Sequence, residues 1–292
     1  MTGPELVVDA HAYLGEGPVW DERRGVLWWV DITPGLIHRY DPRTGLDTAV
    51  PAGSQAGCVV LRRDGNLIAA LADRIAVVDP EHRTVTTLLR FEDGDAALCC
   101  NDGKCDPAGR LWLDRMAPDT SPGRGRLVRV DPNLTVETAI TGLTVPNGIG
   151  WSADGRIMYF TDSAWSEVRR YDYDITTGRM GQGSVLIAFP DDGSVPDGLT
   201  VDAEGCIWLA RWGAGCVVRV SPDGHLLARI ELPVSQTTSC AFGGEDLGDL
   251  YITTAHEDFG PRDFAREPLA GGLFRIRPGV RGLAPARFGS AS

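Results

Sequence analysis

Oxygen-bearing side chains stand beside glycine at four places in the 292-residue sequence, in the segments Glu16-Gly17-Pro18, Asn101-Asp102-Gly103, Pro146-Asn147-Gly148 and Pro196-Asp197-Gly198. Carboxylate and amide oxygens are the ligands that calcium, magnesium and manganese take in proteins. A cation held by only three or four protein groups keeps positions open for water and substrate, so such a set can support hydrolysis. The alternative interpretation is that each is a turn residue, because Asn-Gly and Asp-Gly are common turn dipeptides.

The four residues share one position in an internal repeat. Its pattern is an apolar pair, a turn of acidic residues and glycine, an apolar triplet, and a second alternating run that ends in a turn. Six copies begin at Val19, Val60, Lys104, Gly150, Thr200 and Ala241. Copies of about 40 to 50 residues with several short strands each are typical of propeller blades. The sequence therefore predicts an all-β, six-bladed β-propeller that forms a single domain over residues 1–292.

The repeat predicts a ring of side chains in the central channel, because the innermost strand of every blade lines that channel. We take one apolar residue in each copy to open the first strand, and count four residues back from it. The equivalent positions are Glu16, Gly57, Asn101, Asn147, Asp197 and Thr238. Four of these six carry a carboxylate or an amide. A shared metal site at the channel mouth therefore explains them better than four separate turns.

The composition restricts the class of protein. Long helices are excluded by 36 glycines and 19 prolines, whereas a hydrophobic content of 43% is too high for a disordered chain. The net charge of −12 disfavours nucleic acid and anionic membranes as partners. We expect most of the 40 acids, apart from those in the ring, to be solvated turn residues.

The remaining sequence signals concern location and partners. No apolar run is long enough to span a membrane, and the N-terminus lacks the basic and apolar regions of a secretory signal. The seven cysteines are odd in number and irregularly spaced, which indicates reduced thiols. These signals predict a cytoplasmic protein, monomeric or weakly homo-oligomeric, with no nucleic-acid or membrane partner.

Several longer motifs carry a family resemblance. The segments LGEGPVWD, CNDGKCDPAGRLW, VPNGIGWSADG, VPDGLTVDAEGCIW and LAGGLFRI, in this order, resemble the regucalcin/gluconolactonase family, also called senescence marker proteins. The resemblance extends from about Leu14 to Phe288 and includes the ending GVRGLAPARF. It implies a six-bladed propeller and metal-dependent hydrolysis of sugar lactones to aldonic acids.

The resemblance also implies roles for particular residues. The family's metal-ligand pattern falls on Glu16, Asn147 and Asp197, and its acid/base carboxylate falls on Asp197. Asn101 matches a substrate-contacting asparagine, and Asp119 lies where the family often has a substrate-contacting acid. The implied cofactor is one divalent ion, which is calcium, zinc, manganese or magnesium, and the implied partner is a small-molecule lactone.

Two departures from the family pattern alter one wall of the expected pocket. Many sugar lactonases of the family carry an arginine at the position of Cys99, and Gly-Thr where this chain has Asp114-Arg115. We keep Cys99 among the expected substrate-binding positions, but a thiol does not replace the fork of donors of an arginine. We therefore expect a lactone that is smaller, less hydroxylated or differently shaped than gluconolactone, or another carbonyl substrate.

Two other functions remain open at this point. The same metal could polarise a P=O bond, which would make the protein a hydrolase of phosphotriesters or other esters. A propeller could also bind calcium without turning over any substrate. The polar ring argues against a pure scaffold, but the resemblance does not fix the substrate, since function belongs to the site rather than to the fold.

Overall fold

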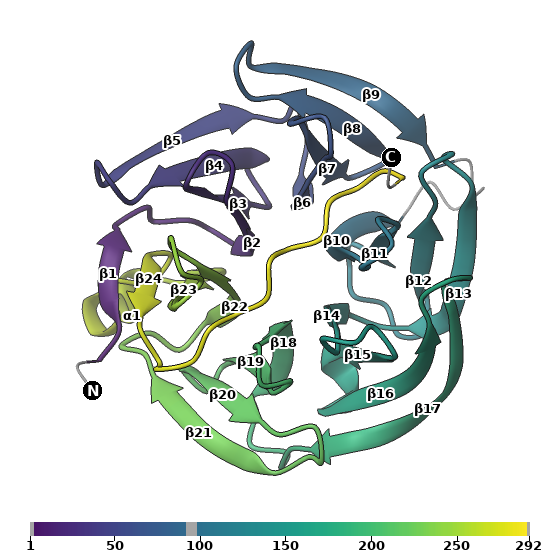
Figure 1. Cartoon of the computed structure of the whole chain (residues 1–292). Helices are drawn as coiled ribbons and strands as arrows, with labels where there is room; N and C mark the ends of the chain where they lie inside the picture. The colour runs from purple at the N-terminus through teal and green to yellow at the C-terminus, as the bar shows by residue number, and fades with distance from the viewer. Residues whose placement is uncertain (1–2, 92–97, 291–292) are drawn as a thin grey trace.

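Six four-stranded antiparallel sheets surround a central axis in the computed structural model, which describes residues 3–91 and 98–290 (Figure 1). The predicted all-β, six-bladed β-propeller is thus confirmed. Within a blade the strands follow one another from the channel outward, and tight hairpins join the first two.

The first three blades contain β2 (Gly15–Asp21), β3 (Val26–Asp31), β4 (Leu36–Asp41) and β5 (Leu46–Pro51); β6 (Ala56–Leu61), β7 (Leu67–Leu71), β8 (Arg74–Asp79) and β9 (Thr84–Arg90); and β10 (Cys99–Cys105), β11 (Leu111–Met116), β12 (Gly125–Val130) and β13 (Val136–Leu143). The next two contain β14 (Pro146–Trp151), β15 (Ile157–Asp162), β16 (Glu167–Asp174) and β17 (Arg179–Ala188); and β18 (Val195–Val201), β19 (Ile207–Trp212), β20 (Cys216–Val220) and β21 (Leu226–Glu231). The last contains β22 (Thr237–Gly243), β23 (Asp249–Thr254), β24 (Leu273–Ile276) and β1 (Glu5–Val8).

The sixth blade closes the ring with strands from both ends of the chain. Strand β1 is its outermost strand and pairs antiparallel with β24, so that Glu5 lies opposite Arg275. The side chains of these two residues also form an ion pair. The repeat pattern did not predict this closure, because the N-terminal strand stands outside the six copies.

The hydrophobic core lies between the blades. Six buried clusters occur in the described part of the chain, and each joins two neighbouring blades. Strand alternation explains this arrangement, because successive side chains point to opposite faces of a sheet. Trp28, for example, packs between the first and second blades, whereas Trp29 packs between the first and sixth.

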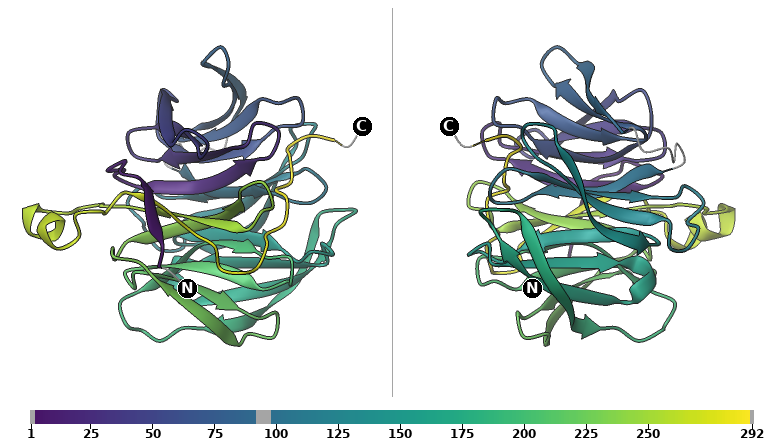
Figure 2. Two further views of the ribbon diagram at one scale, coloured as in Figure 1. Left: turned by 60° about the vertical axis from the view of Figure 1, so that its left-hand side comes forward. Right: turned by 90° about the vertical axis from the view of Figure 1, so that its right-hand side faces the viewer.

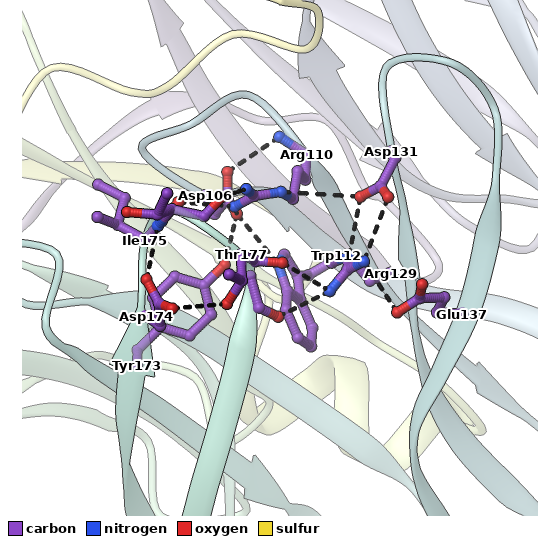
Figure 3. Close-up of polar contacts among 12 residues, drawn as sticks. Asp106, Arg110, Trp112, Arg129, Asp131, Glu137, Tyr173, Asp174, Ile175 and Thr177 are labelled. Atoms are coloured by element: carbon purple, nitrogen blue, oxygen red, sulfur yellow. Dashed lines mark hydrogen bonds and ion pairs between the residues drawn. The ribbon is translucent and has the colours of Figure 1, made fainter.

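A buried carboxylate ties the third and fourth blades together (Figure 3). Asp106 follows β10 and accepts hydrogen bonds from Nη1 of Arg110 at 2.9 Å and from the hydroxyl of Tyr173, in the fourth blade, at 2.5 Å. Arg129 extends the network to the carbonyl oxygen of Gly178 at 2.8 Å. Asp21, Asp106 and Asp202, at the ends of inner strands, are fully buried and are exceptions to the expectation that most acids outside the ring are solvated.

The two faces of the ring differ. The C-terminal segment crosses the face that holds the hairpins between first and second strands, where Gly282 pairs with Asp202 and Phe288 with Arg62 (Figure 1). The helix α1 (Pro261–Arg266) projects from the opposite face (Figure 2). A single 3-10 turn, η1 (Ser163–Trp165), follows β15. Within residues 3–91 and 98–290, no helix has the length and apolar character needed to cross a bilayer.

Candidate active site

All six inner strands contain an irregularity at the predicted ring position. The antiparallel register of β2, β6, β10, β14, β18 and β22 with their second strands shifts at or directly beside Glu16, Gly57, Asn101, Asn147, Asp197 and Thr238. A bulge leaves a residue unpaired and bends its strand, which redirects a side chain out of the normal alternation. The bulges therefore explain how one position in every blade is turned toward the channel.

The structure corrects the assumed start of the first strands. The apolar residues from which the ring was counted, such as Trp151 and Val201, lie at the ends of their strands, whereas Asn147 and Asp197 lie near the beginnings. The ring residues are therefore strand residues and do not form turns. Glycine follows Asn147 because the inner strands approach closely there. A Cβ added to Gly148, which has φ +37°, would lie 2.4 Å from the carbonyl oxygen of Asp197.

The three predicted metal ligands are buried, and local backbone contacts orient two of them. Glu16, Asn147 and Asp197 are 6%, 5% and 5% exposed. One carboxylate oxygen of Glu16 accepts from the backbone nitrogen of Gly17 at 2.7 Å, and Oδ1 of Asn147 accepts from that of Gly148 at 3.1 Å. Among the described residues, Oδ1 of Asp197 has no hydrogen-bond partner although it is buried.

Burial and the repulsion between neighbouring carboxylates shift the pKa values of the acidic groups. Burial, then the charges of Asp197 and Asp102, raise the pKa of Glu16 well above its ordinary value of 4.5. Burial, then the charge of Asp102, raise the pKa of Asp197 well above 3.8, and hydrogen bonds from the backbone of Gly198 and from Asn147 oppose that shift. Each group thus opposes ionisation of the others, and a cation among them would remove that repulsion.

The ligand chemistry of this cluster suits a hard cation. In the described part of the chain, no group of three or more His, Cys, Asp or Glu side chains is placed to hold a metal ion. A site here would need an amide oxygen as its third protein ligand beside the carboxylates of Glu16 and Asp197. Such all-oxygen sets are typical of calcium, magnesium and manganese rather than of structural zinc.

The predicted substrate-binding residues are distributed less uniformly. Asn101 lies in the ring, half-buried, and its Nδ2 donates to the carbonyl oxygen of Pro146 at 3.0 Å, which links it to the strand of Asn147. Cys99 begins β10, and its half-buried Sγ lies 3.6 Å from the carbonyl oxygen of Met116. Asp119 is exposed in the loop between β11 and β12, outside the buried cluster.

The departures at Asp114 and Arg115 lie in the interior. Asp114 is fully buried, and neither of its carboxylate oxygens has a hydrogen-bond partner among the described residues. Burial raises its pKa well above the ordinary value, which favours the neutral form. Arg115 is also buried and lies over the ring of Phe91, with Nη2 donating to the carbonyl oxygen of Leu98 at 2.9 Å.

Two channel residues were missed by the sequence reasoning. Asp102 is buried beside the ring, and Lys104 extends an ammonium group across the channel to the carbonyl oxygen of Leu199 at 2.5 Å. Both follow Asn101 in the same inner strand. The period of two along a strand would have suggested that Asp102 and Lys104 face the same way. The spacing of Asp102 and Lys104 along the strand could therefore have indicated that both face the channel, in addition to the one ring position in each copy.

A cavity of about 410 Å³ lies under the ring, toward the face crossed by the C-terminal segment. Its walls include Asp102 and Lys104, together with largely apolar residues of the inner strands. The segment from Leu283 to Ala286 contributes to its lining. The channel is thus hollow between the buried carboxylates and the C-terminal segment.

Comparison with known proteins agrees with this architecture. Residues 14–256 match the family model described as SMP-30/gluconolactonase/LRE-like region. The chain is 42% identical over 283 residues to pentonolactonase XacC of Haloferax volcanii, with 92% of each protein covered, and 34% identical over 291 residues to regucalcin of Xenopus laevis, with 97% of each covered. The crystal structure of a calcium-binding protein, regucalcin, from Agrobacterium tumefaciens superposes with a TM-score of 0.94 at 30% identity, covering 98% of this chain and 97% of the other. The chain therefore belongs to the SMP-30/gluconolactonase family, whose named members include sugar lactonases.

Proposed function

We propose that this protein is a divalent-metal-dependent lactonase that opens a sugar-type lactone to its hydroxy acid. The observation that carries the proposal is the buried, unpartnered Oδ1 of Asp197 beside Glu16 and Asn147. Leaving such an atom without a donor is costly unless a ligand completes its surroundings. The 42% identity to a pentonolactonase, over 92% of both chains, supports lactone hydrolysis as the use of that site.

Glu16, Asn147 and Asp197 would hold the metal ion. The backbone donors to Glu16 and Asn147 fix the direction of their oxygens, so little reorganisation would be needed on binding. When bound, a divalent cation supplies Lewis-acid polarisation of a carbonyl and acidifies a water molecule. The calcium-binding description of the Agrobacterium relative supports calcium as the first ion to test.

The chain's own groups would move the proton. One carboxylate oxygen of Asp197 takes a proton from the attacking water, while the water oxygen forms a bond to the lactone carbonyl carbon. The bond between that carbon and the ring oxygen then breaks, and Asp197 returns the proton to the departing oxygen. The products are a carboxylic acid and a hydroxyl group on one molecule, and the acid then releases its proton to the solvent. Asn101, whose Nδ2 already donates to Pro146, would offer its amide oxygen to a substrate hydroxyl.

We propose a five-carbon aldonolactone as the substrate class. Cys99 supplies one half-buried thiol where many relatives have an arginine, so fewer sugar hydroxyls can be bound on that side. Asp119 lies on a loop at the same end of the inner strands as the ring, where it would contact hydroxyls that project from the channel mouth. The name of the Haloferax relative agrees with a pentonolactone.

The proposal is tested with a pH-indicator assay over a panel of pentono- and hexonolactones. Chelator-treated protein is supplied with calcium, magnesium, manganese or zinc in turn. We expect acid release only with a metal, faster with pentonolactones than with gluconolactone. Asp197→Ala should abolish turnover, and Cys99→Arg should shift the preference toward the larger lactone.

Other outcomes would replace the proposal. Turnover of phosphotriesters without turnover of any lactone would indicate the alternative hydrolase. Tight calcium binding with no turnover of any substrate would indicate a calcium-binding protein. Full activity of Asp197→Ala with metal present would remove Asp197 from the mechanism.

A further inference from the structure

Lys104 is the only lysine in the sequence, and the other 27 of the 28 basic side chains are arginines. A lone lysine would ordinarily be found on the surface, since an ammonium group is strongly hydrated. Here it is half-buried inside the central channel, where it lines the cavity under the ring. This placement requires an explanation, because it puts a cation near a proposed cation site.

The side chain of Lys104 crosses the channel. It leaves β10 in the third blade, and its Nζ donates to the carbonyl oxygen of Leu199 on β18 in the fifth blade, at 2.5 Å. The inner strand of the fourth blade, β14, lies between those two strands in the ring (Figure 1). The carbonyl that holds the ammonium group therefore belongs to the strand that carries Asp197.

The order of residues along the strands fixes the depth of the ammonium group. Leu199 comes two residues after Asp197, and Lys104 comes two residues after Asp102. Inner strands run from the ring toward the face crossed by the C-terminal segment. The ammonium group consequently contacts β18 two residues beyond Asp197, on the side of the cavity that Asp102 and Lys104 both line.

The charges in this part of the channel can be counted. Glu16, Asp102 and Asp197 are all about nine-tenths buried or more, and each can carry one negative charge. The ammonium group of Lys104 lies within electrostatic range of Glu16 and Asp102, and its charge favours their ionised forms. Three carboxylates and one ammonium group sum to −2, which is the charge that one divalent cation neutralises.

We propose that Lys104 is a built-in counter-cation that, together with the carboxylates of Glu16, Asp102 and Asp197, sets the net charge of the site at −2 and so matches it to divalent ions. This inference rests on the proposed metal site and adds a residue that determines its charge selectivity. Because the ammonium group is bound by a carbonyl oxygen of the fifth blade, two blades away, it stays close to the ring without occupying a metal-ligand position. An arginine would carry the same charge on a larger, planar head with five donors.

The test compares the affinities of calcium and lanthanum ions, which are similar in size and differ by one charge. Isothermal titration of chelator-treated protein gives both dissociation constants for the wild type, Lys104→Met and Lys104→Arg. Methionine keeps much of the length of the side chain and removes the charge. We expect Lys104→Met to raise the preference for lanthanum over calcium by about tenfold or more, since the removed charge repels a trivalent ion more strongly than a divalent one. Lys104→Arg should stay near the wild-type ratio.

The outcomes separate the two proposals. If wild-type protein binds neither ion, the proposed metal site itself is wrong. If it binds both and a folded Lys104→Met variant keeps the wild-type ratio, the role of Lys104 is refuted. Should that variant fail to fold, wild-type protein with ¹⁵N-labelled lysine gives a single side-chain amine signal. That signal should shift in step with calcium saturation, and a signal that does not move would overturn the inference.

Discussion

Replacing Asp197 with asparagine should stabilise the metal-free protein. The carboxylate is 5% exposed, its Oδ1 has no donor among the described residues, and Glu16 and Asp102 act on it with like charge. A buried charge without a cationic partner is destabilising, so removing the charge in Asp197→Asn should raise the free energy of unfolding by about 2 kcal/mol. For a chain of 292 residues that corresponds to a Tm increase of about 3 °C.

The assay is thermal and chemical unfolding in the presence of a chelator, followed by calcium titration. Asp202→Asn is the matched control, because Asp202 is equally buried but accepts from Trp208 Nε1 at 2.9 Å and from Arg219 Nε at 2.8 Å. Breaking that pairing should destabilise the protein by about 3–5 kcal/mol. The two substitutions therefore change stability in opposite directions.

A decrease in stability of Asp197→Asn under chelation would refute the reasoning, because it would mean that the protein already satisfies this carboxylate without a ligand. Unchanged stability would lead to the same conclusion. Calcium should stabilise the wild type and have little effect on the variant, since one ligand has lost its charge. If calcium stabilised both equally, Asp197 would not belong to the metal site.

The remaining predictions concern pH, a glycine and a thiol. The pKa values of the Glu16 and Asp197 carboxyls are raised well above 4.5 and 3.8, so protonation favours the folded state. Metal-free protein should therefore lose stability as the pH rises from these ordinary values through the raised ones. Melting curves with chelator should show this loss and saturating calcium should remove it; a Tm that rises with pH under chelation would contradict it. Gly198→Ala should destabilise the protein by about 2 kcal/mol or more in denaturant titrations, because the new Cβ would lie 2.1 Å from Oγ of Ser239, and unchanged stability would show that the strands can separate freely. Cys99→Ser should keep kcat within about threefold, because burial raises the pKa of this thiol and disfavours a nucleophilic thiolate, whereas a thousandfold loss would indicate covalent catalysis.

The architecture could be predicted because each blade repeats one local pattern of strands and turns. The ring could be predicted for the same reason, since Glu16, Asn147 and Asp197 occupy one register of that pattern. The bulges beside them could not be predicted, because a bulge is defined by the pairing of two strands, and the apolar pattern of one strand does not contain that register. For this reason the first strands begin earlier than expected.

The partners of buried charged side chains are the second feature that could not be predicted from the sequence. Asp202 looks like an ordinary turn residue in the sequence, and only the fold brings Trp208 and Arg219 to it. Lys104 likewise has no local signal for its partner, which is the carbonyl oxygen of Leu199, two blades away. Contacts of this kind depend on how the blades close around the channel, and one sequence contains no direct record of that closure.

The closure of the sixth blade by β1 has a consequence for how the chain reaches its native state. Glu5 must find Arg275 across 270 residues, so the last pairing cannot form until nearly all of the polypeptide has been synthesised. Contacts so distant in sequence slow folding. Until the sixth blade is complete, the blades that form earlier expose strand edges and apolar faces. A nascent chain of this protein is therefore most prone to aggregation just before its final segment emerges, and removal of either terminus should leave an open ring rather than a smaller propeller.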